Sequence, residues 1–155
     1  MNSSELKTII DFAVTNEVEA YEFYRDAANI IKEESLKELF NQLAEEELKH
    51  KGFLENFLND FLKEGTDEIK LDEFNDYKIA ETIDEPKLSI NMSFPDAIAL
   101  AIKKEQSAME LYDNLGGLCL EEDKKDIFLG LKEMEKMHKA RLEEIYVNVA
   151  YNEIW

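Results

Sequence analysis

The sequence predicts an all-α protein, a four-helix bundle made of two duplicated helical hairpins that are joined by a long crossover connection. Three observations favour this fold. Apolar residues recur at alternating three- and four-residue steps in four separate segments, which is the pattern of amphipathic helices. The 155 residues include only five glycines and two prolines, so little interrupts long helices. The second half repeats the first half at an offset of 88 residues, as from Glu17 to Glu105.

The first hairpin is predicted over about residues 3–63. Ser3 or Ser4 can cap the N-terminus of its first helix, and Glu5 adds a favourable negative charge to the opening turn. A short turn after Ile31 makes the second helix antiparallel to the first. The two apolar stripes contain Leu6, Ile10, Ala13, Ala20, Tyr24, Ala27 and Ile31, then Leu36, Phe40, Leu43, Leu54, Phe57 and Phe61.

The second hairpin is predicted over about residues 93–150. Ser93 and Pro95 mark the start of its first helix, because serine caps helices and proline is tolerated in the first turn. Gly116 and Gly117 are expected to fray the end of that helix, and the turn that follows is short. The two apolar stripes contain Ile98, Ala101, Ala108, Tyr112 and Leu115, then Phe128, Leu131, Leu142, Ile145 and Val149.

The connection between the hairpins covers about residues 64–92, and a single domain is expected over residues 1–155. The connection is too long for a tight turn, so it can run the length of a bundle and deliver the third helix parallel to the second. A short helix is expected within it at Leu71–Ala80. Because apolar residues match at the 88-residue offset, as Phe40 matches Phe128, the hairpins should be related by an approximate twofold axis.

Six polar residues lie on the apolar stripes rather than on the solvated faces. Burying an isolated carboxylate costs several kcal/mol, which is a large part of the roughly 5–15 kcal/mol by which a whole domain is stable. No stripe position carries a lysine or arginine that could neutralise these groups. They are Glu17, Glu47 and His50 in the first hairpin and Glu105, Glu135 and His138 in the second.

A pair of divalent metal ions would neutralise this set. Glu47 and His50 are three residues apart, as are Glu135 and His138, so each pair projects from one helix face and can bind the same ion. Four carboxylates and two ions of charge +2 give a neutral site with two neutral imidazoles. Oxygen and nitrogen ligands without a thiolate suit iron or manganese, with zinc as an alternative.

Tyr24 and Tyr112 each lie seven residues after one of the stripe glutamates, on the same helix face. They are either core aromatics with satisfied hydroxyls or donors of hydrogen bonds to the metal-binding carboxylates. Met109, Met134 and Met137 are expected to pack rather than to take part in chemistry, and Glu46 is expected to face solvent like the other acids off the stripes. Cys119, near a helix end, is expected to be inert.

Charge and composition exclude several classes of partner. The 36 acidic and 18 basic residues give a net charge of −18, which repels phosphate backbones, so we expect no nucleic-acid partner. The N-terminus lacks the basic and apolar regions of a signal peptide. No apolar run approaches the ~18 residues of a membrane span, so we expect no membrane association. The single cysteine excludes an intrachain disulfide and fits a cytoplasmic location.

Four stretches of the sequence carry the stripe glutamates and histidines in a pattern known from one protein family. They are Glu17-x-x-Ala20-x-x-Phe23-Tyr24, Leu43-Ala44-Glu45-Glu46-Glu47-x-x-His50, Glu105-x-x-Ala108-x-x-Leu111-Tyr112 and Glu135-x-x-His138. Over roughly residues 3–150 the chain resembles the ferritin-like superfamily and, within it, the rubrerythrin-type diiron domain. The resemblance implies one terminal glutamate for each ion, two bridging glutamates, and one histidine for each ion. Glu17 and Glu105 would be the terminal ligands, and Glu47 and Glu135 would be the bridging ligands. His50 and His138 would each bind one ion.

The resemblance also implies an activity. Members of the family react a reduced pair of iron ions with hydrogen peroxide or dioxygen, and rubrerythrins typically reduce peroxide to water. Full-length rubrerythrins carry a four-cysteine rubredoxin module, whereas this chain has one cysteine. Electrons are therefore expected from an external, rubredoxin-like donor protein. Rubrerythrins also tend to have an extra glutamate three residues after the third-helix ligand. That position is Ala108 here, so the site is expected to be more symmetric.

Other functions fit the same residues. The protein could be a ferroxidase or iron-handling protein, a manganese catalase-like enzyme, or a non-catalytic metal-binding helical module. Storage of iron would require a hollow shell of many subunits. A homodimer is expected, and the long connection between the hairpins is compatible with an exchange of hairpins between its subunits.

Overall fold

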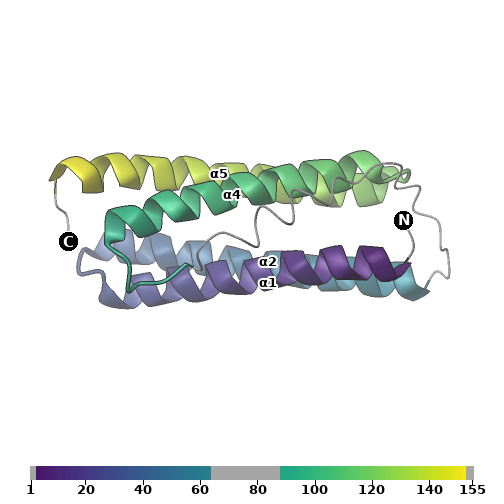
Figure 1. Ribbon diagram of the computed structural model, residues 1–155, viewed down its shortest axis with the longest axis horizontal. Coiled ribbons are helices and arrows are strands. Elements are labelled where there is room, and N and C mark those ends of the chain that lie inside the picture. Colours follow the sequence, from purple (N-terminus) through teal and green to yellow (C-terminus); the bar gives the residue numbers. More distant parts are fainter. Residues whose placement is uncertain (1–2, 64–87, 153–155) are drawn as a thin grey trace.

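The computed structural model describes residues 3–63 and 88–152, and this part of the chain contains four α-helices. The all-α four-helix bundle that the sequence predicts is thereby confirmed (Figure 1). None of these helices is long and apolar enough to cross a membrane. The short helix predicted at Leu71–Ala80 and most of the predicted connection lie outside the described residues. The helices are α1 (Ser3–Ile30), α2 (Glu34–Lys63), α4 (Phe94–Leu118) and α5 (Glu122–Asn152).

The helices pair as two antiparallel hairpins that lie side by side (Figure 1). Helix α1 packs along α2, and α4 packs along α5. Between the hairpins, α2 contacts α5. Helix α4 runs in the same direction as α2, which is the direction that a long connection between the hairpins allows.

Polar side chains define where two of the helices begin. At the start of α4, Ser93 Oγ accepts a hydrogen bond from the backbone N–H of Asp96 at 3.3 Å, and a proline occupies the first turn. At the start of α2, the Glu33 carboxylate accepts hydrogen bonds from the backbone N–H groups of Ser35 at 3.1 Å and Leu36 at 2.8 Å. Both arrangements satisfy N–H groups that have no partner within the helix.

The glycines near the end of α4 do not fray it, in contrast to the sequence-based expectation. The helix continues through Gly116 and Gly117 to its last residue. A Cβ atom on Gly116 would lie 3.3 Å from Leu129 Cδ2 and 3.4 Å from Phe128 Cβ. The residue is therefore small because α4 and α5 approach closely where their hairpin closes.

The apolar core consists of two clusters at opposite ends of the bundle. One cluster contains Tyr24 and Phe40, and the other contains Tyr112 and Phe128. The 88-residue offset exchanges these residues between the clusters, as an approximate twofold axis requires. In every helix, the stripe glutamates and histidines lie between the residues of one cluster and the residues of the other. The centre of the bundle is thus polar, and both of its ends are apolar.

Candidate metal centre

Every helix contributes polar side chains to the middle of the bundle. Helices α2 and α5 each supply a glutamate and a histidine from one face, and α1 and α4 each supply a glutamate. All of them are at most 3% exposed, and no other charged side chain is buried within residues 3–63 and 88–148. The sequence predicted this burial from the positions of the residues on the apolar stripes. They are Glu17, Glu47, His50, Glu105, Glu135 and His138.

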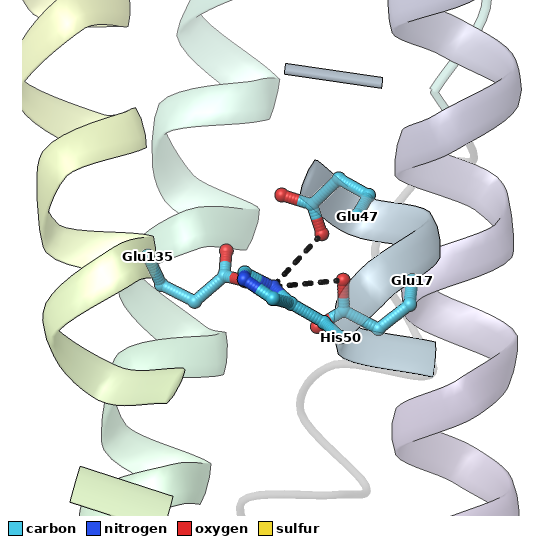
Figure 2. A group of neighbouring side chains, drawn as sticks. All are labelled: Glu17, Glu47, His50 and Glu135. Atoms are coloured by element: carbon cyan, nitrogen blue, oxygen red, sulfur yellow. Dashed lines mark ion pairs between the residues drawn. The ribbon is translucent and has the colours of Figure 1, made fainter. Parts of the chain in front are cut away.

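Four of these residues form one group around the ring of His50. The ligand atoms of Glu17, Glu47, His50 and Glu135 all lie within 4.8 Å of one another, and Figure 2 shows the carboxylates gathered at the imidazole. The Nδ1 atom of His50 lies 2.5 Å from Glu135 Oε1, 3.6 Å from Glu17 Oε2 and 3.8 Å from Glu47 Oε2. Side chains from three helices therefore meet at one ring nitrogen.

The second group mirrors the first around His138. Its Nδ1 atom lies 2.6 Å from Glu47 Oε1, 3.8 Å from Glu105 Oε1 and 3.9 Å from Glu135 Oε2. The ring of His138 stacks on the ring of His50, with centroids 5.7 Å apart and 15° between the planes. Glu47 and Glu135 belong to both groups. The site is thus two four-residue groups that share a pair of carboxylates.

Several atoms of the cluster have no hydrogen-bond partner within the described residues. They are Glu17 Oε2, Glu105 Oε2, Glu135 Oε1 and both ring nitrogens of His50. The contact of 2.5 Å between His50 Nδ1 and Glu135 Oε1 does not have hydrogen-bond geometry. Each unsatisfied buried group costs about 1–3 kcal/mol, and more when it is charged. Convergent carboxylate oxygens and imidazole nitrogens with no other partner fit a pair of divalent ions such as iron or manganese.

Two buried tyrosines donate hydrogen bonds to the cluster across the two hairpins. The Tyr24 hydroxyl on α1 donates to Glu105 Oε1 on α4 at 2.6 Å, and the Tyr112 hydroxyl on α4 donates to Glu17 Oε1 on α1. Burial, followed by the charge of nearby glutamates, raises the pKa of both phenols well above the usual value of 10.0. Both therefore stay protonated and act as donors. The partner is in each case the glutamate of the other hairpin rather than the glutamate seven residues earlier.

Glu46 does not face solvent as the sequence analysis expected. Its carboxylate is hydrogen-bonded to Nε2 of His138, and its side chain is only 16% exposed. On its other side, Gln42 Nε2 donates to Glu46 Oε1 at 3.2 Å. Glu46 lies one position away from the apolar stripe of α2, and its partner lies 92 residues along the chain on α5. Helical periodicity reports the face of one helix, so it gave no signal for this contact.

The two histidines differ in their electrostatics. Burial lowers the pKa of His50 from 6.5. Burial acts in the same direction on His138, but the carboxylates of Glu105 and Glu47 outweigh it and raise the pKa of this histidine to about 11. At 3.8 Å, Glu105 acts on Nδ1 by its charge. Burial, followed by the charge of Glu105, raises the pKa of Glu47 to about 7. In the metal-free protein, His138 is therefore the cation among the carboxylates.

A cavity of about 280 Å³ lies between α1 and α4 and reaches the cluster. It is lined by the carboxylates of Glu17 and Glu105 and by the rings of Tyr24 and Tyr112, and it extends to Glu47. The cluster is closed along the bundle axis by the two apolar clusters. Among the described residues, the face between α1 and α4 therefore offers a small molecule a route to the cluster.

The fold and the six residues define the class of this protein, a ferritin-like four-helix bundle with a buried carboxylate and histidine cluster that could bind a pair of metal ions. The family model for rubrerythrin matches residues 8–146, so the chain belongs to the rubrerythrin family. The chain is also similar to a solved structure, a hypothetical protein from Pyrococcus furiosus. The two share 29% sequence identity with a TM-score of 0.73, over 94% of this chain and 90% of that one. A comparison with curated proteins gives no match.

Proposed function

We propose that this chain is a diiron oxidoreductase of the rubrerythrin type. It would reduce hydrogen peroxide or dioxygen to water with electrons from an external, rubredoxin-like donor protein. The observation that carries the proposal is the pair of buried ligand groups that share Glu47 and Glu135. Membership of the rubrerythrin family supports it.

The two ligand groups support a role for each of the six residues in this proposal. The shared carboxylates would bridge the two ions, and each remaining glutamate would bind one ion together with one histidine. Bound in this way, the metal pair would supply the two electrons that, with two protons, convert one molecule of peroxide into two molecules of water. The bridging pair is Glu47 with Glu135, and the terminal pairs are Glu17 with His50 and Glu105 with His138.

Other residues would hold the site in shape and control access to it. The hydrogen bonds from Tyr24 and Tyr112 fix the terminal carboxylates of the opposite hairpin, so that these ligands keep their orientation. Both tyrosines line the cavity between α1 and α4, where their protonated hydroxyls can contact an entering peroxide. The apolar clusters at both ends exclude bulk water along the bundle axis.

A single-turnover experiment tests the proposal. The metal-free protein is loaded with Fe(II) under anaerobic conditions, the bound iron is counted, and one molecule of hydrogen peroxide is added for every two bound ions. We expect two iron ions per chain, complete loss of peroxide, and growth of the near-ultraviolet absorbance of oxidised iron. With reduced rubredoxin present, the protein should consume peroxide over many turnovers.

Variants and product analysis separate the proposal from other functions. Glu135→Ala removes a carboxylate that both groups share, so it should abolish iron binding and turnover. Glu45→Ala removes an exposed carboxylate from the same central region of the bundle and should leave both unchanged. Unaltered peroxide in the presence of bound iron would contradict the proposal. Evolution of oxygen without a donor would indicate a catalase instead, and a large hollow assembly that accumulates iron would indicate a ferroxidase.

A further inference from the structure

The two histidines have different neighbours on the side of the ring that faces away from the carboxylate groups. Nε2 of His138 is hydrogen-bonded to Glu46. Nε2 of His50 is buried and has no hydrogen-bond partner within the described residues. The Nδ1 sides of the two rings, in contrast, face matching sets of carboxylates. The surroundings of the two Nδ1 atoms therefore follow the approximate twofold axis, whereas the surroundings of the two Nε2 atoms do not.

The 88-residue repeat shows where the symmetry is lost. The offset maps the two histidines onto each other, and it maps Glu46 of α2 onto Met134 of α5. It also maps Gln42, which donates a hydrogen bond to Glu46, onto Gly130. A linked pair of polar side chains in the first hairpin therefore corresponds to a thioether and a bare backbone position in the second.

A charged residue adds to this difference. Arg141 on α5 interacts electrostatically with Glu46, whose carboxylate also contacts His138. The repeat maps Arg141 onto Phe53, an apolar side chain that is 53% exposed. The outer side of His138 is thus polar and charged, and the equivalent positions around His50 are apolar.

A carboxylate behind a metal-binding histidine changes what that histidine does. By accepting the Nε2–H it fixes the tautomer in which Nδ1 carries the free lone pair, and it makes the ring a stronger donor to the metal. Loss of such a partner typically lowers metal affinity about 10–100-fold. The inner ligands of the two groups match in kind and number, so they offer no reason of their own for unequal affinity.

We infer that the two metal positions are not equivalent. The position that His138 serves binds its ion more tightly, because Glu46 orients and polarises this histidine, whereas no residue in the described part of the chain does so for His50. Glu46 is a positioning residue, and Met134 marks the position where the second hairpin lacks one. This inference rests on the proposed dinuclear site, since it concerns the order in which that site fills.

Metal titration tests the inference without relying on activity. The metal-free protein is titrated with Co(II) in a calorimeter, and separately with ⁵⁷Fe(II) under anaerobic conditions for Mössbauer spectroscopy. We expect two binding steps whose affinities differ about 10–100-fold. The first equivalent of ⁵⁷Fe should give one quadrupole doublet, and the second equivalent should give a distinct one.

Reciprocal variants then assign the two steps. Glu46→Gln should weaken the tight step about tenfold or more and leave the weak step unchanged. Met134→Glu should strengthen the weak step, because it supplies the carboxylate that the second hairpin lacks. Glu45→Gln removes an equal charge from the exposed neighbouring position of α2 and should leave both steps unchanged. Helix content measured by circular dichroism verifies that each variant is folded.

The outcomes distinguish this inference from the proposed function. A protein that binds no Co(II) or Fe(II) contradicts the dinuclear site and the inference together. Two ions bound with equal affinity overturn the inference and leave the dinuclear site intact. The inference also fails if Glu46→Gln weakens both steps equally or if folded Met134→Glu leaves the weak step unchanged. If Glu46→Gln does not fold, Met134→Glu still tests the inference, because this substitution adds an interaction rather than removing one.

Discussion

Glu47 and Glu135 differ from the other four cluster residues because they belong to both ligand groups. Removing a shared carboxylate should therefore affect two ions, whereas removing Glu17 should affect one. We predict that Glu47→Ala purifies with neither ion after Fe(II) loading and gel filtration, and that Glu17→Ala retains about one per chain. Elemental analysis of the protein fraction measures this. Equal loss in both variants would show that the two groups do not bind separate ions.

The hydroxyl of Tyr24 gives a second test at the scale of single residues. Tyr24→Phe deletes the donor at 2.6 Å from Glu105 Oε1 and leaves a buried carboxylate oxygen without a partner. We expect the free energy of unfolding of the metal-free protein to fall by about 1–3 kcal/mol. Denaturant titration measures the change. Tyr146→Phe, at a residue that is 38% exposed, should stay within about 0.5 kcal/mol.

The residue scale also shows what could be learned from the sequence. Burial of the six glutamates and histidines could be predicted, because each one replaces an apolar residue in a periodic stripe. Their convergence followed from the common register of the two halves. The contact between Glu46 and His138 could not be predicted, since it joins two helices and one of its residues lies off the stripe. The sequence offered the tyrosines as donors to metal-binding carboxylates, which the hydrogen bonds bear out, but it did not indicate which carboxylates, because each bond crosses between hairpins.

At the scale of the elements, the ends of the helices could be predicted where a local signal exists. The cap at Ser93 starts α4 as expected, because a hydroxyl that accepts from Asp96 N–H is a contact within one turn. The glycines of α4 were misread, because their role depends on α5. Gly116 lies against Leu129 and Phe128, and nothing within its own helix reveals that proximity.

This difference between glycines predicts opposite effects of the same substitution. In the interior of a helix, Gly→Ala stabilises by about 0.5–1 kcal/mol. Gly130→Ala in α5 should approach this gain, because nothing lies within 4 Å of the added Cβ. Gly116→Ala should lose the gain or become destabilising, since its Cβ would crowd Leu129 and Phe128 at 3.3–3.4 Å. Melting temperatures of the two variants provide the comparison, and equal stabilisation would show that the hairpin can open without cost.

At the scale of the whole molecule, charge dominates the behaviour of the metal-free protein. The net charge of −18 opposes compaction, and four of the carboxylates that contribute to it meet in the centre of the bundle. Metal ions that bind only the folded state should raise its stability by an amount that grows with the logarithm of their concentration relative to the dissociation constant. In the metal-free protein the cluster binds protons instead, since the pKa of His138 is raised to about 11 and that of Glu47 to about 7.

The direction of the resulting pH dependence follows from these two values. The folded protein holds both protons more tightly than the unfolded chain, whose values are 6.5 for histidine and 4.5 for glutamate. The stabilisation from Glu47 is complete below pH 4.5 and is lost as the pH rises through about 7. The stabilisation from His138 is complete below pH 6.5 and is lost as the pH rises through about 11. His50, whose pKa is lowered from 6.5, has the opposite effect, but only below about pH 7.

Above about pH 7, stability of the metal-free protein should therefore fall as the pH increases, because the folded state binds more protons than the unfolded state. We predict that its melting temperature decreases steadily between about pH 7 and 9, whereas the metal-loaded protein changes less, since its imidazoles hold metal instead of protons. Scanning calorimetry at low ionic strength measures both. His138→Gln, which cannot hold this proton, should reduce the slope in the metal-free protein. A metal-free protein that becomes more stable towards pH 9 would show that His138 is not the cation balancing the carboxylates.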